Sequence, residues 1–524
     1  MPAAIVTDLL AEQAAKNGSR VAAVLDGIGE ITYAEWDRQS SRLGRKLAAL
    51  GLKAGDRVGL LFSNREALAF MVGYFAIHKA GGVVVPINTR LTPKEIGYIL
   101  HHSEAKGALA EGSCAERVAQ ARKDAPAVSW AVIKGTPGNS TGGGEKCWED
   151  ILKDGDDSPF QVPQTKDDLC DILYTSGTTG FPKGVACSHE NVAGLGGGGG
   201  LDKLFAGMTF LHAVPLFTFA GTHAMMMIPL RAGMTSVIQP KFDADRYLEL
   251  VAERKVALTY SVPSMLLLLL DAKSAGRHDY SSLKMIMYGT APMPPEGVRR
   301  LGKLFSKTLL LNLYGLTEGG GAACSLPPHE AQKRPDSIGK PLPPTQVRIV
   351  REEDSAAAGP REVGEIQLKG ASRRSYFKNE KATGETWTED GWLKTGDLGY
   401  LDEDGFLYIS GRNKDIIIRG GFNVYPIEIE AALHDHPAVQ EAAVVGIPHK
   451  VLGEDVKAFV VLKPGKQVKA EELLEHCRKT LADYKCPRQI EFVSELPRNA
   501  LGKVLKRVLR DGAAGQEGTG LAAG

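Results

Sequence analysis

Short apolar runs alternate with segments of helical length in the first part of the chain. Residues 58–62 and 82–86 are apolar runs of strand length, and residues 67–79 between them have the length and apolar character of a buried helix. Strands that alternate with helices predict a parallel sheet with helices on both faces. The first part of the chain is therefore predicted to be α/β.

The same alternation resumes after Leu201. Strands are predicted at residues 210–214, 235–238, 257–260, 285–288 and 309–313. Ligands of open α/β sheets collect at the carboxyl ends of strands. We therefore expect the loops that start at Tyr174, Tyr288 and Tyr314 to share one crevice.

The pattern changes after Trp392. Residues 393–412 alternate apolar positions with a turn signal, Glu403-Asp404-Gly405, which predicts a β-hairpin. A small α+β domain is predicted beyond it, from helices at 426–434 and 470–481 and strands at 439–445, 455–462 and 489–493. The Gly/Ala-rich tail, residues 511–524, is predicted to be disordered.

Length and composition narrow the protein class. At 524 residues the chain exceeds the size of one hydrophobic core, so at least two domains are expected. The 63 basic and 62 acidic residues give a net charge of +1, which disfavours a nucleic-acid partner. Seven scattered cysteines without metal-ligand spacing favour reduced thiols and a cytoplasmic location. The longest apolar run, residues 264–270, is too short to span a bilayer, so no transmembrane segment is expected.

The segment with the clearest chemistry is YTSGTTGFPKG, residues 174–184. It combines four Ser/Thr hydroxyls and three glycines with Lys183, which suits a loop that holds phosphate. Its spacing differs from the Walker A motif, which needs four residues between its glycines. An ordinary Gly/Ser/Thr turn is the alternative interpretation. The phosphate-binding candidates are Thr175, Ser176, Gly177, Thr178, Thr179 and Lys183.

Four further motifs follow in order: NLYGLTE, TGDLGY, GRNKDIIIRGGFNVYPIEIE and PRNALGKVLKR, at residues 312–318, 395–400, 411–430 and 497–507. With the phosphate loop, they make the chain resemble the adenylate-forming superfamily of acyl- and aryl-CoA synthetases, peptide-synthetase adenylation domains and luciferases. The AMP-forming acyl-CoA synthetases are the most similar group. The resemblance extends from residue 31 to Arg510.

The resemblance implies an α/β fold in two domains. The large N-terminal domain, residues 1–412, would contain parallel-rich sheets, helices and a β-barrel-like portion. The small α+β domain, residues 413–524, would be mobile and carry a catalytic lysine.

Roles at the ATP site also follow from the resemblance. Glu318 would bind Mg²⁺, since hard oxygen ligands suit that ion, and Thr317 would contact phosphate. Asp397 would accept hydrogen bonds from the ribose hydroxyls, and Arg412 would assist at the ribose or phosphate. The adenine segment would be Gly289, Thr290 and Ala291, followed on the next strand by Tyr314. In isolation, Glu318 would be an exposed helix-start residue and the adenine segment a plain turn.

The resemblance also assigns the two catalytic states. Lys503 would bridge the substrate carboxylate and the α-phosphate during adenylation. Lys414 corresponds to the hinge about which the small domain rotates. The rotation would bring Gly420 and Gly421 to the tunnel for the pantetheine arm, where glycine permits close backbone approach. The alternative for this pair is a glycine turn before a helix.

The acyl pocket is the least determined part of the site. By resemblance it is formed near Gly198, Thr218, Phe219, Tyr260, Gly320 and Gly321, with Gly289 beside them. Residues 215–221 contain no aspartate to pair with an α-amino group, and Thr218 replaces the histidine of most related ligases. Phe219 would supply an aromatic wall. His223 could partly substitute for the missing histidine, although an ordinary packed histidine is the favoured interpretation, and the sequence leaves open which of Thr218, Phe219 and His223 acts as the gate. The many glycines predict an enlarged pocket, although a mobile glycine loop explains them as well.

The predicted function is AMP-forming ligation of a carboxylic acid to coenzyme A, with ATP, Mg²⁺ and CoA required. The predicted acid is a medium- or long-chain fatty acid or a bulky polycyclic acid. The alternatives are an aryl-acid CoA ligase, a ligase that loads a carrier protein, and a nucleotide-binding protein without catalysis. The sequence leaves the oligomeric state open, a homo-oligomer included.

Overall fold

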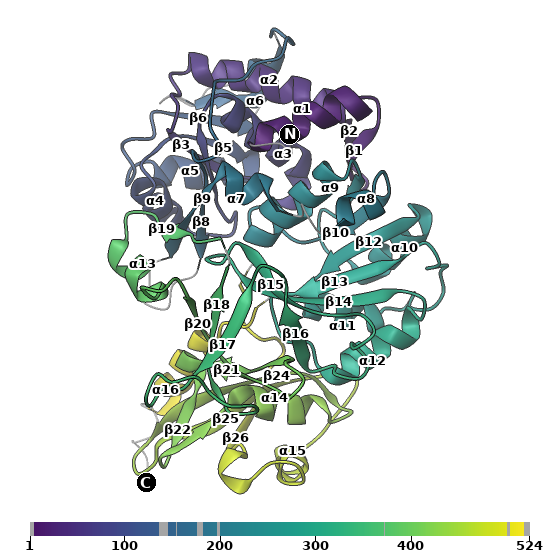
Figure 1. Cartoon of the computed structure of the whole chain (residues 1–524), viewed down its shortest axis with the longest axis vertical. Helices are drawn as coiled ribbons and strands as arrows, with labels where there is room; N and C mark the ends of the chain where they lie inside the picture. Colours follow the sequence, from purple (N-terminus) through teal and green to yellow (C-terminus); the bar gives the residue numbers. More distant parts are fainter. Residues whose placement is uncertain are drawn as a thin grey trace.

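The computed structural model describes residues 5–135, 145–153, 155–175, 182–195, 200–370, 372–499 and 503–517. Within these residues the strands form sheets of 13, 8 and 5 strands. The 8-stranded sheet and the first helices occupy the upper part of Figure 1, and the 5-stranded sheet lies at the opposite end. No helix in the described ranges is both long and apolar enough to cross a membrane.

The 8-stranded sheet has the order β19-β9-β8-β4-β3-β5-β6-β7. Its central strands are parallel, while β9 and β19 are antiparallel to their neighbours. The strands are β3 Arg57–Leu61, β4 Val83–Pro86, β5 Ala105–Glu111, β6 Trp130–Lys134, β7 Glu145–Cys147, β8 Leu169–Thr175, β9 Lys183–Ser188 and β19 Ser375–Tyr376. The strands predicted at 58–62 and 82–86 are confirmed to within one residue.

Helices cover this sheet. They are α1 Val6–Asn17, α2 Tyr33–Ala49, α3 Ala67–Lys79, α4 Pro93–His102, α5 Ala115–Ala121, α6 Trp148–Lys153 and α7 His189–Ala193. The predicted helix at 67–79 is confirmed as α3. All its residues except Leu68 are buried, because it packs against α2 and α1 and also contacts β3, β4 and β1, strands of both large sheets. A helix that is apolar all round is expected in such a central position.

The 13-stranded sheet has the order β17-β18-β20-β21-β16-β15-β14-β13-β12-β10-β11-β1-β2. One part is largely parallel: β1 Val21–Leu25, β2 Gly29–Thr32, β10 Thr209–His212, β11 Thr235–Ile238, β12 Val256–Ser261, β13 Met285–Gly289 and β14 Leu309–Leu316. The other part is antiparallel: β15 Gly321–Leu326, β16 Ser337–Pro341, β17 Gln346–Val350, β18 Gly364–Lys369, β20 Leu393–Leu401 and β21 Leu407–Arg412.

The helices of this region are α8 Leu201–Leu204, α9 Met227–Arg231, α10 Ala244–Glu253, α11 Pro263–Leu270, α12 Pro295–Leu304 and α13 Glu380–Thr386. All five strands predicted after Leu201 are confirmed, with different ends for most of them. The predicted barrel-like portion does not close into a barrel among the described strands. The reason is that β16 pairs with both β15 and β21, which joins the antiparallel strands to the parallel sheet in one open path.

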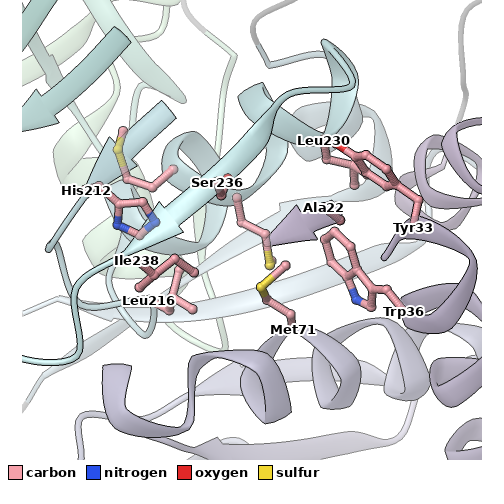
Figure 2. Close-up of a pocket in the computed structure, with 11 residues that line it drawn as sticks. Ala22, Tyr33, Trp36, Met71, His212, Leu216, Leu230, Ser236 and Ile238 are labelled. Atoms are coloured by element: carbon pink, nitrogen blue, oxygen red, sulfur yellow. The ribbon is translucent and has the colours of Figure 1, made fainter. Parts of the chain in front are cut away.

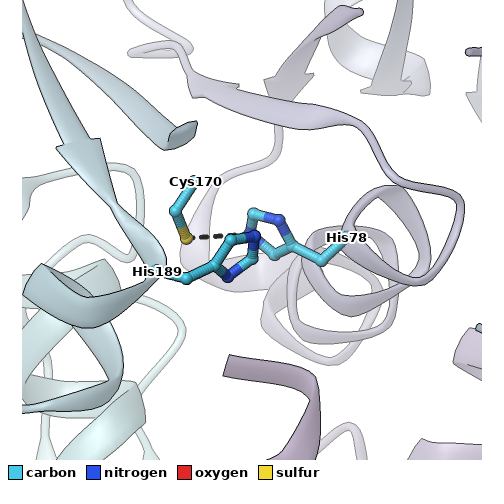
Figure 3. Close-up of side chains that lie close together, drawn as sticks. All are labelled: His78, Cys170 and His189. Carbon is cyan, nitrogen blue, oxygen red and sulfur yellow. Dashed lines mark hydrogen bonds between the residues drawn. The ribbon is translucent and has the colours of Figure 1, made fainter. Parts of the chain in front are cut away.

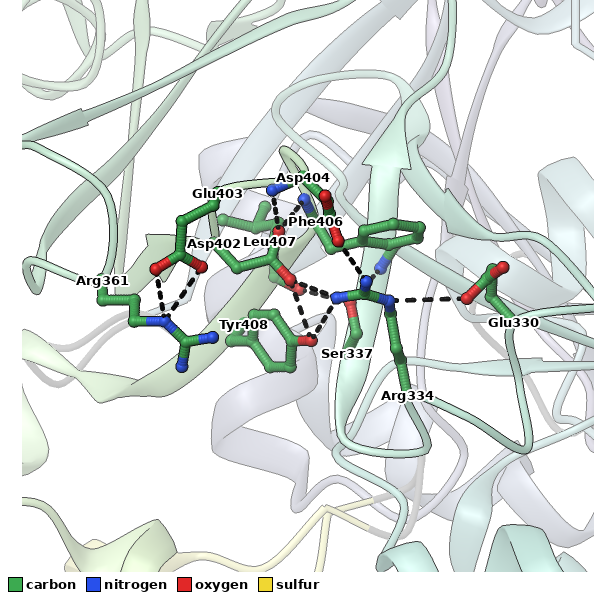
Figure 4. A network of polar contacts seen from close by, with 11 residues as sticks. Glu330, Arg334, Ser337, Arg361, Asp402, Glu403, Asp404, Phe406, Leu407 and Tyr408 are labelled. Atoms are coloured by element: carbon green, nitrogen blue, oxygen red, sulfur yellow. Dashed lines mark hydrogen bonds and ion pairs between the residues drawn. The ribbon is translucent and has the colours of Figure 1, made fainter.

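The hairpin β20–β21 confirms the prediction for residues 393–412, and its turn is fixed by a network of charges (Figure 4). Arg334 pairs with Asp402 and Asp404, and its guanidinium carbon lies 4.3 Å from the centroid of the Phe406 ring. Asp402 also accepts backbone hydrogen bonds across the turn from Asp404 and Phe406, at 3.0 and 2.8 Å. The turn is thereby held against the rest of the large sheet.

The 5-stranded sheet contains β22 Ile417–Arg419, β23 Phe422–Val424, β24 Val439–His449, β25 Gly453–Leu462 and β26 Gln489–Phe492, with α14 Pro426–His434, α15 Ala470–Arg478 and α16 Lys506–Glu517. The predicted small α+β region is present. The expectation of disorder from Asp511 is wrong as far as Glu517, because α16 continues through this segment. Leu509 and Ala513 on α16 pack into an apolar cluster with β24 and β25. Residues 518–524 lie outside the described residues.

Candidate active site

The predicted phosphate loop begins at the end of β8 and finishes at the start of β9, and these two strands pair with each other. Thr175 ends β8 and is paired with Lys183 at the start of β9. The Lys183 ammonium lies 5.0 Å from the centroid of the Tyr376 ring, and it forms no ion pair with the described residues. Ser176, Gly177, Thr178 and Thr179 lie outside the described residues. The structure therefore shows where the loop begins and ends and where its lysine points.

Tyr376 joins this loop to the YGLTE segment. Its hydroxyl donates a 2.8 Å hydrogen bond to Oε1 of Glu318, in the turn between β14 and β15. Burial, followed by the Glu318 charge, raises the pKa of Tyr376, so the phenol stays a donor. Lys183 and Glu318 thus approach the same ring from different sheets. The loops expected to share a crevice start on two different sheets, since β8 belongs to one and β13 and β14 to the other.

Asp397 is the centre of a second polar group. Its Oδ2 accepts a 2.8 Å hydrogen bond from the Tyr314 hydroxyl, and its Oδ1 lies 2.9 Å from Nε of Arg412. Asp397 and Arg412 are opposite one another in the β20–β21 hairpin, which explains their contact. A carboxylate has about four lone-pair sites, so Asp397 keeps acceptor capacity for a diol. Burial and then the Asp397 charge raise the pKa of Tyr314.

Lys503 lies close to this group. Its backbone is fixed by two 2.9 Å hydrogen bonds with Asn499, one to the side chain and one from the backbone amide. The protein around its ammonium, followed by the charge of Arg412, lowers the pKa of Lys503 to about 8, while Asp397 opposes this shift. The residue still keeps an exposed surface. The charges at the predicted ribose site of the large domain therefore act on the predicted lysine of the small domain.

The predicted adenine segment follows β13 directly. Thr290 has φ +70°, in the left-handed region that non-glycine residues seldom adopt, and such strain is typical of functional sites. A Cβ on Gly289 would lie 2.2 Å from the carbonyl oxygen of Leu313 on the neighbouring strand. Gly289 is thus required by the close approach of β13 and β14. It does not support the interpretation that glycine here widens a pocket.

Backbone conformation also explains why glycine occupies other positions of the predicted pocket. Gly320 and Gly321 have φ of +84° and +123°, so side chains at either position would strain the turn. A Cβ on Gly321 would lie 3.6 Å from the Phe219 ring and 3.4 Å from Leu195. Gly198 lies outside the described residues. The glycine count is therefore no measure of pocket size.

Thr218 and His223 have structural partners. The Thr218 hydroxyl donates to the Pro215 carbonyl and accepts from the Gly221 amide, at 2.8 and 3.1 Å, at the start of the π-helix Ala220–Met226. His223 is fully buried and bonded through Nε2 to Asp171, which confirms the interpretation of a packed histidine. Phe219 lies beside it, with ring centroids 5.0 Å apart.

Tyr260 is also buried. It lies on β12, beside His212 on β10 and Met287 on β13.

Known proteins match the chain over nearly its whole length. Residues 10–375 match the family described as AMP-binding enzyme, and residues 428–503 match the AMP-binding enzyme C-terminal domain. The chain belongs to the AMP-binding enzyme family. A 2-succinylbenzoate–CoA ligase of Geobacillus sp. (strain WCH70) is 36% identical over 93% of this chain and 94% of its own. A long-chain-fatty-acid–CoA ligase of Bacillus subtilis (strain 168) is 31% identical over 97% and 94%.

A solved structure is similar in fold. The anthranilate CoA ligase AuaEII in complex with anthranoyl-AMP superposes with a TM-score of 0.87 at 27% identity, covering 98% of each chain. The two-part organisation of this AMP-binding enzyme is thus that of known adenylate-forming ligases.

Residues at the predicted hinge and tunnel lie at the start of the small sheet of this AMP-binding enzyme. Lys414 is exposed in a short 3₁₀-helix, Asn413–Asp415, between β21 and β22. Gly420 and Gly421, with φ of +58° and +85°, form the two-residue loop of the β22–β23 hairpin, which requires positive φ at both positions. The pair is a hairpin tip, and its apolar neighbours Ile418 and Phe422 are 56% and 58% exposed.

Sequence reasoning missed a buried cluster of possible metal ligands. One ligand atom from each of His78, Cys170 and His189 lies within 4.8 Å of the others (Figure 3). They come from α3, β8 and α7, so no sequence spacing could reveal them. Burial lowers the pKa of His189 to about 3 and raises that of Cys170 well above its usual value. Sulfur and imidazole suit a soft divalent cation rather than Mg²⁺. All seven cysteines are free of disulfides.

A small internal cavity lies apart from these groups (Figure 2). It has room for no more than about one water molecule. Its wall includes Trp36, Met71 and His212 and none of the predicted acyl-pocket residues. Burial lowers the pKa of His212 to about 4, and the backbone of Val214 opposes this shift. This cavity suits an internal water and does not hold the acid.

Proposed function

We propose that this protein activates a carboxylic acid with ATP and transfers it to coenzyme A, in two half-reactions that use different positions of the small domain. By class it is an AMP-forming acid–CoA ligase. The observation that supports the residue assignments is that the charges of Asp397 and Arg412, which pair with each other in the large domain, act on the ammonium of Lys503 in the small domain.

In the first half-reaction, an oxygen of the acid attacks the α-phosphorus of ATP and the bond to pyrophosphate breaks. Lys503 would offset the charge that two anions bring together, and Asp397 would hold the ribose hydroxyls. Lys183 would contact the phosphates. Glu318 makes no ion pair with the described residues, so its carboxylate is free to bind Mg²⁺, which would neutralise phosphate charge.

In the second half-reaction, the thiol sulfur of coenzyme A attacks the acyl carbon, its proton is lost, and AMP leaves. Lys503 has no role in this step and occupies the space near the adenylate. Rotation about Lys414 would remove Lys503 and bring the Gly420-Gly421 tip to the site. The exposed Ile418 and Phe422 would then gain an apolar contact surface, which favours the rotated state.

The acid itself is less determined than the reaction. The relatives act on an aryl acid and on long-chain fatty acids, according to their names, and both classes are candidate substrates. The glycines no longer favour the bulky alternative, because Gly289, Gly320 and Gly321 are explained by strand contact and positive φ. Coenzyme A and a carrier-protein phosphopantetheine present the same pantetheine arm, so the pantetheine tunnel does not distinguish these two acceptors.

The test is pyrophosphate release with ATP and Mg²⁺ over fatty, aryl, oxo and dicarboxylic acids, with and without coenzyme A. We expect release with at least one class and acyl-CoA formation in step with it. Release without any thioester would favour a carrier-protein acceptor. Absence of release with every acid would refute the catalytic assignment.

The pH dependence of adenylation should report Lys503. Its pKa is lowered to about 8, so the ammonium is charged below that pH and loses its proton as pH rises through it. We expect kcat/KM for adenylation to fall about tenfold per pH unit above about pH 8. In Lys503→Arg the side chain stays charged, so any residual activity should lack this decline. Stopped-flow pyrophosphate release from pH 6.5 to 9.5 would measure both profiles, and an identical decline in the two proteins would contradict the assignment.

A further inference from the structure

Arg374 is a buried cation with most of its hydrogen-bonding capacity unused. It immediately precedes β19 and is only 3% exposed. Nη1 donates a 3.2 Å hydrogen bond to the Thr317 carbonyl, whereas Nε and Nη2 have no hydrogen-bond partner among the residues that the structure describes. No carboxylate of the described residues lies within ion-pair distance of it. Burying a charge without a partner is costly, so a functional reason is expected.

The guanidinium of Arg374 lies beside residues of the predicted acyl pocket. Its central carbon lies 5.2 Å from the centroid of the Phe219 ring. A Cβ built on Gly320 would lie 3.0 Å from the Cβ of Ser372 and 3.5 Å from Nη2 of Arg374, so this glycine borders the cation. Phe219 and Gly320 both belong to the predicted pocket. The guanidinium of Arg374 therefore borders the predicted acyl pocket.

Asp171 and Glu318 act together with Arg374 on the pKa of Cys187, and neither carboxylate forms an ion pair with Arg374. Asp171 accepts hydrogen bonds through Oδ2 from Tyr74 and His223, and it is completely buried. Glu318 is bonded to Tyr376, on the side of Lys183. Among the described residues no oxygen accepts a hydrogen bond from Nε or Nη2 of Arg374, so an oxygen of a ligand can fill that role.

We propose that Arg374 binds an oxygen atom of the substrate acid that is remote from its reacting carboxyl group. The preferred acid then carries a second carboxylate or a carbonyl group. This inference rests on the proposed acid-activating function and specifies its substrate class. An acid with a wholly apolar tail would leave the guanidinium buried and unpaired, so it is the poorer substrate.

The experiment compares Arg374→Met with wild type on acids that differ only in a remote oxygen. One series is octanoate, 7-oxooctanoate and octanedioate, and the other is 4-phenylbutanoate and 4-oxo-4-phenylbutanoate. We expect wild type to favour an oxygen-bearing member at least about tenfold in kcat/KM, which corresponds to one good polar contact. Arg374→Met should abolish this preference and leave KM for ATP unchanged. Arg373→Met, at the exposed neighbouring arginine, is the matched control and should behave as wild type.

Two kinetic results would overturn the proposal. One is a wild-type enzyme without preference in either series. The other is a variant that loses activity equally on all acids or raises KM for ATP, since Arg374 would then act on the reacting carboxylate or the phosphates.

Thermal unfolding tests the same point without turnover. The unliganded Arg374→Met protein should have a melting temperature no lower than wild type, because an unpaired buried charge has been replaced by an apolar chain. A lower melting temperature would show a structural role and overturn the proposal. Octanedioate should raise the melting temperature of wild type more than octanoate does, and should lose that advantage in the variant. If octanedioate stabilises wild type no more than octanoate does, the inference about Arg374 is overturned, whether or not any acid is turned over. If octanedioate does stabilise wild type more but no acid is turned over, only the proposed reaction is contradicted.

Discussion

Lys503→Ala is expected to lower the rate of acyl-adenylate formation by about 10²–10³-fold, the usual effect of removing one donor that stabilises developing charge. The charges that shift the pKa of Lys503 are those of Arg412, Asp397, Lys414 and Asp415, all at or beside the predicted nucleotide site or the hinge. Removal of Lys503 leaves the carboxylate and the α-phosphate without this cation. Single-turnover formation of acyl-AMP, measured by quench and chromatography, would give the rate.

The second half-reaction provides the internal control. Thioester formation from added acyl-AMP and coenzyme A should be nearly unchanged in Lys503→Ala, because the lysine acts only before pyrophosphate leaves. Lys506→Ala is the matched variant, since Lys506 pairs with Glu430 at 2.6 Å on the small domain. Equal loss of both half-reactions in Lys503→Ala would contradict its assignment to adenylation.

Asp397→Asn is expected to lower kcat/KM for ATP by about 10–10²-fold, which is the value of one or two hydrogen bonds to a charged group. The amide keeps the size of the carboxylate and loses its charge and half of its acceptor capacity. Arg412 then lacks its ion pair, and Lys503 lacks the charge that raises its pKa. The decline of adenylation with pH should accordingly move below about pH 8.

Initial rates over a series of ATP concentrations and pH values would measure both effects. Asp390→Asn is the control, because Asp390 is an exposed carboxylate in the turn before β20. A wild-type KM for ATP together with an unshifted pH profile in Asp397→Asn would show that Asp397 does not serve the nucleotide site.

Local patterns predicted the elements well where local chemistry decides them. The helices at 67–79 and 426–434, the strand at 235–238 and the hairpin at 393–412 have the predicted bounds, since apolar runs and turn residues determine them. The tail was predicted less well. Its Gly/Ala content indicated disorder, but Leu509 and Ala513 bury themselves against strands far away in the sequence.

Several residues of the candidate site could not be predicted, because no sequence motif marks them. Tyr376 and Arg374 are in a segment without a motif, and their importance comes from contacts with the β14–β15 turn in another sheet. Asp171 did offer one signal, a carboxylate within an otherwise apolar strand. Its partners Tyr74 and His223 are nevertheless 97 and 52 positions away along the chain.

The sequence by itself determined the family, the phosphate loop and the chemical types of the groups that would handle ATP, because motifs preserve residue identity and spacing. Only the tertiary structure decided how those groups combine. It showed that the charges of Asp397 and Arg412 act on Lys503. It also explained Gly289 by strand contact and Thr218 by a helix start, and it showed Arg374 buried without a full set of partners among the described residues. The physical reason is that pairing, burial and pKa depend on distances between segments remote in sequence, which residue order does not specify.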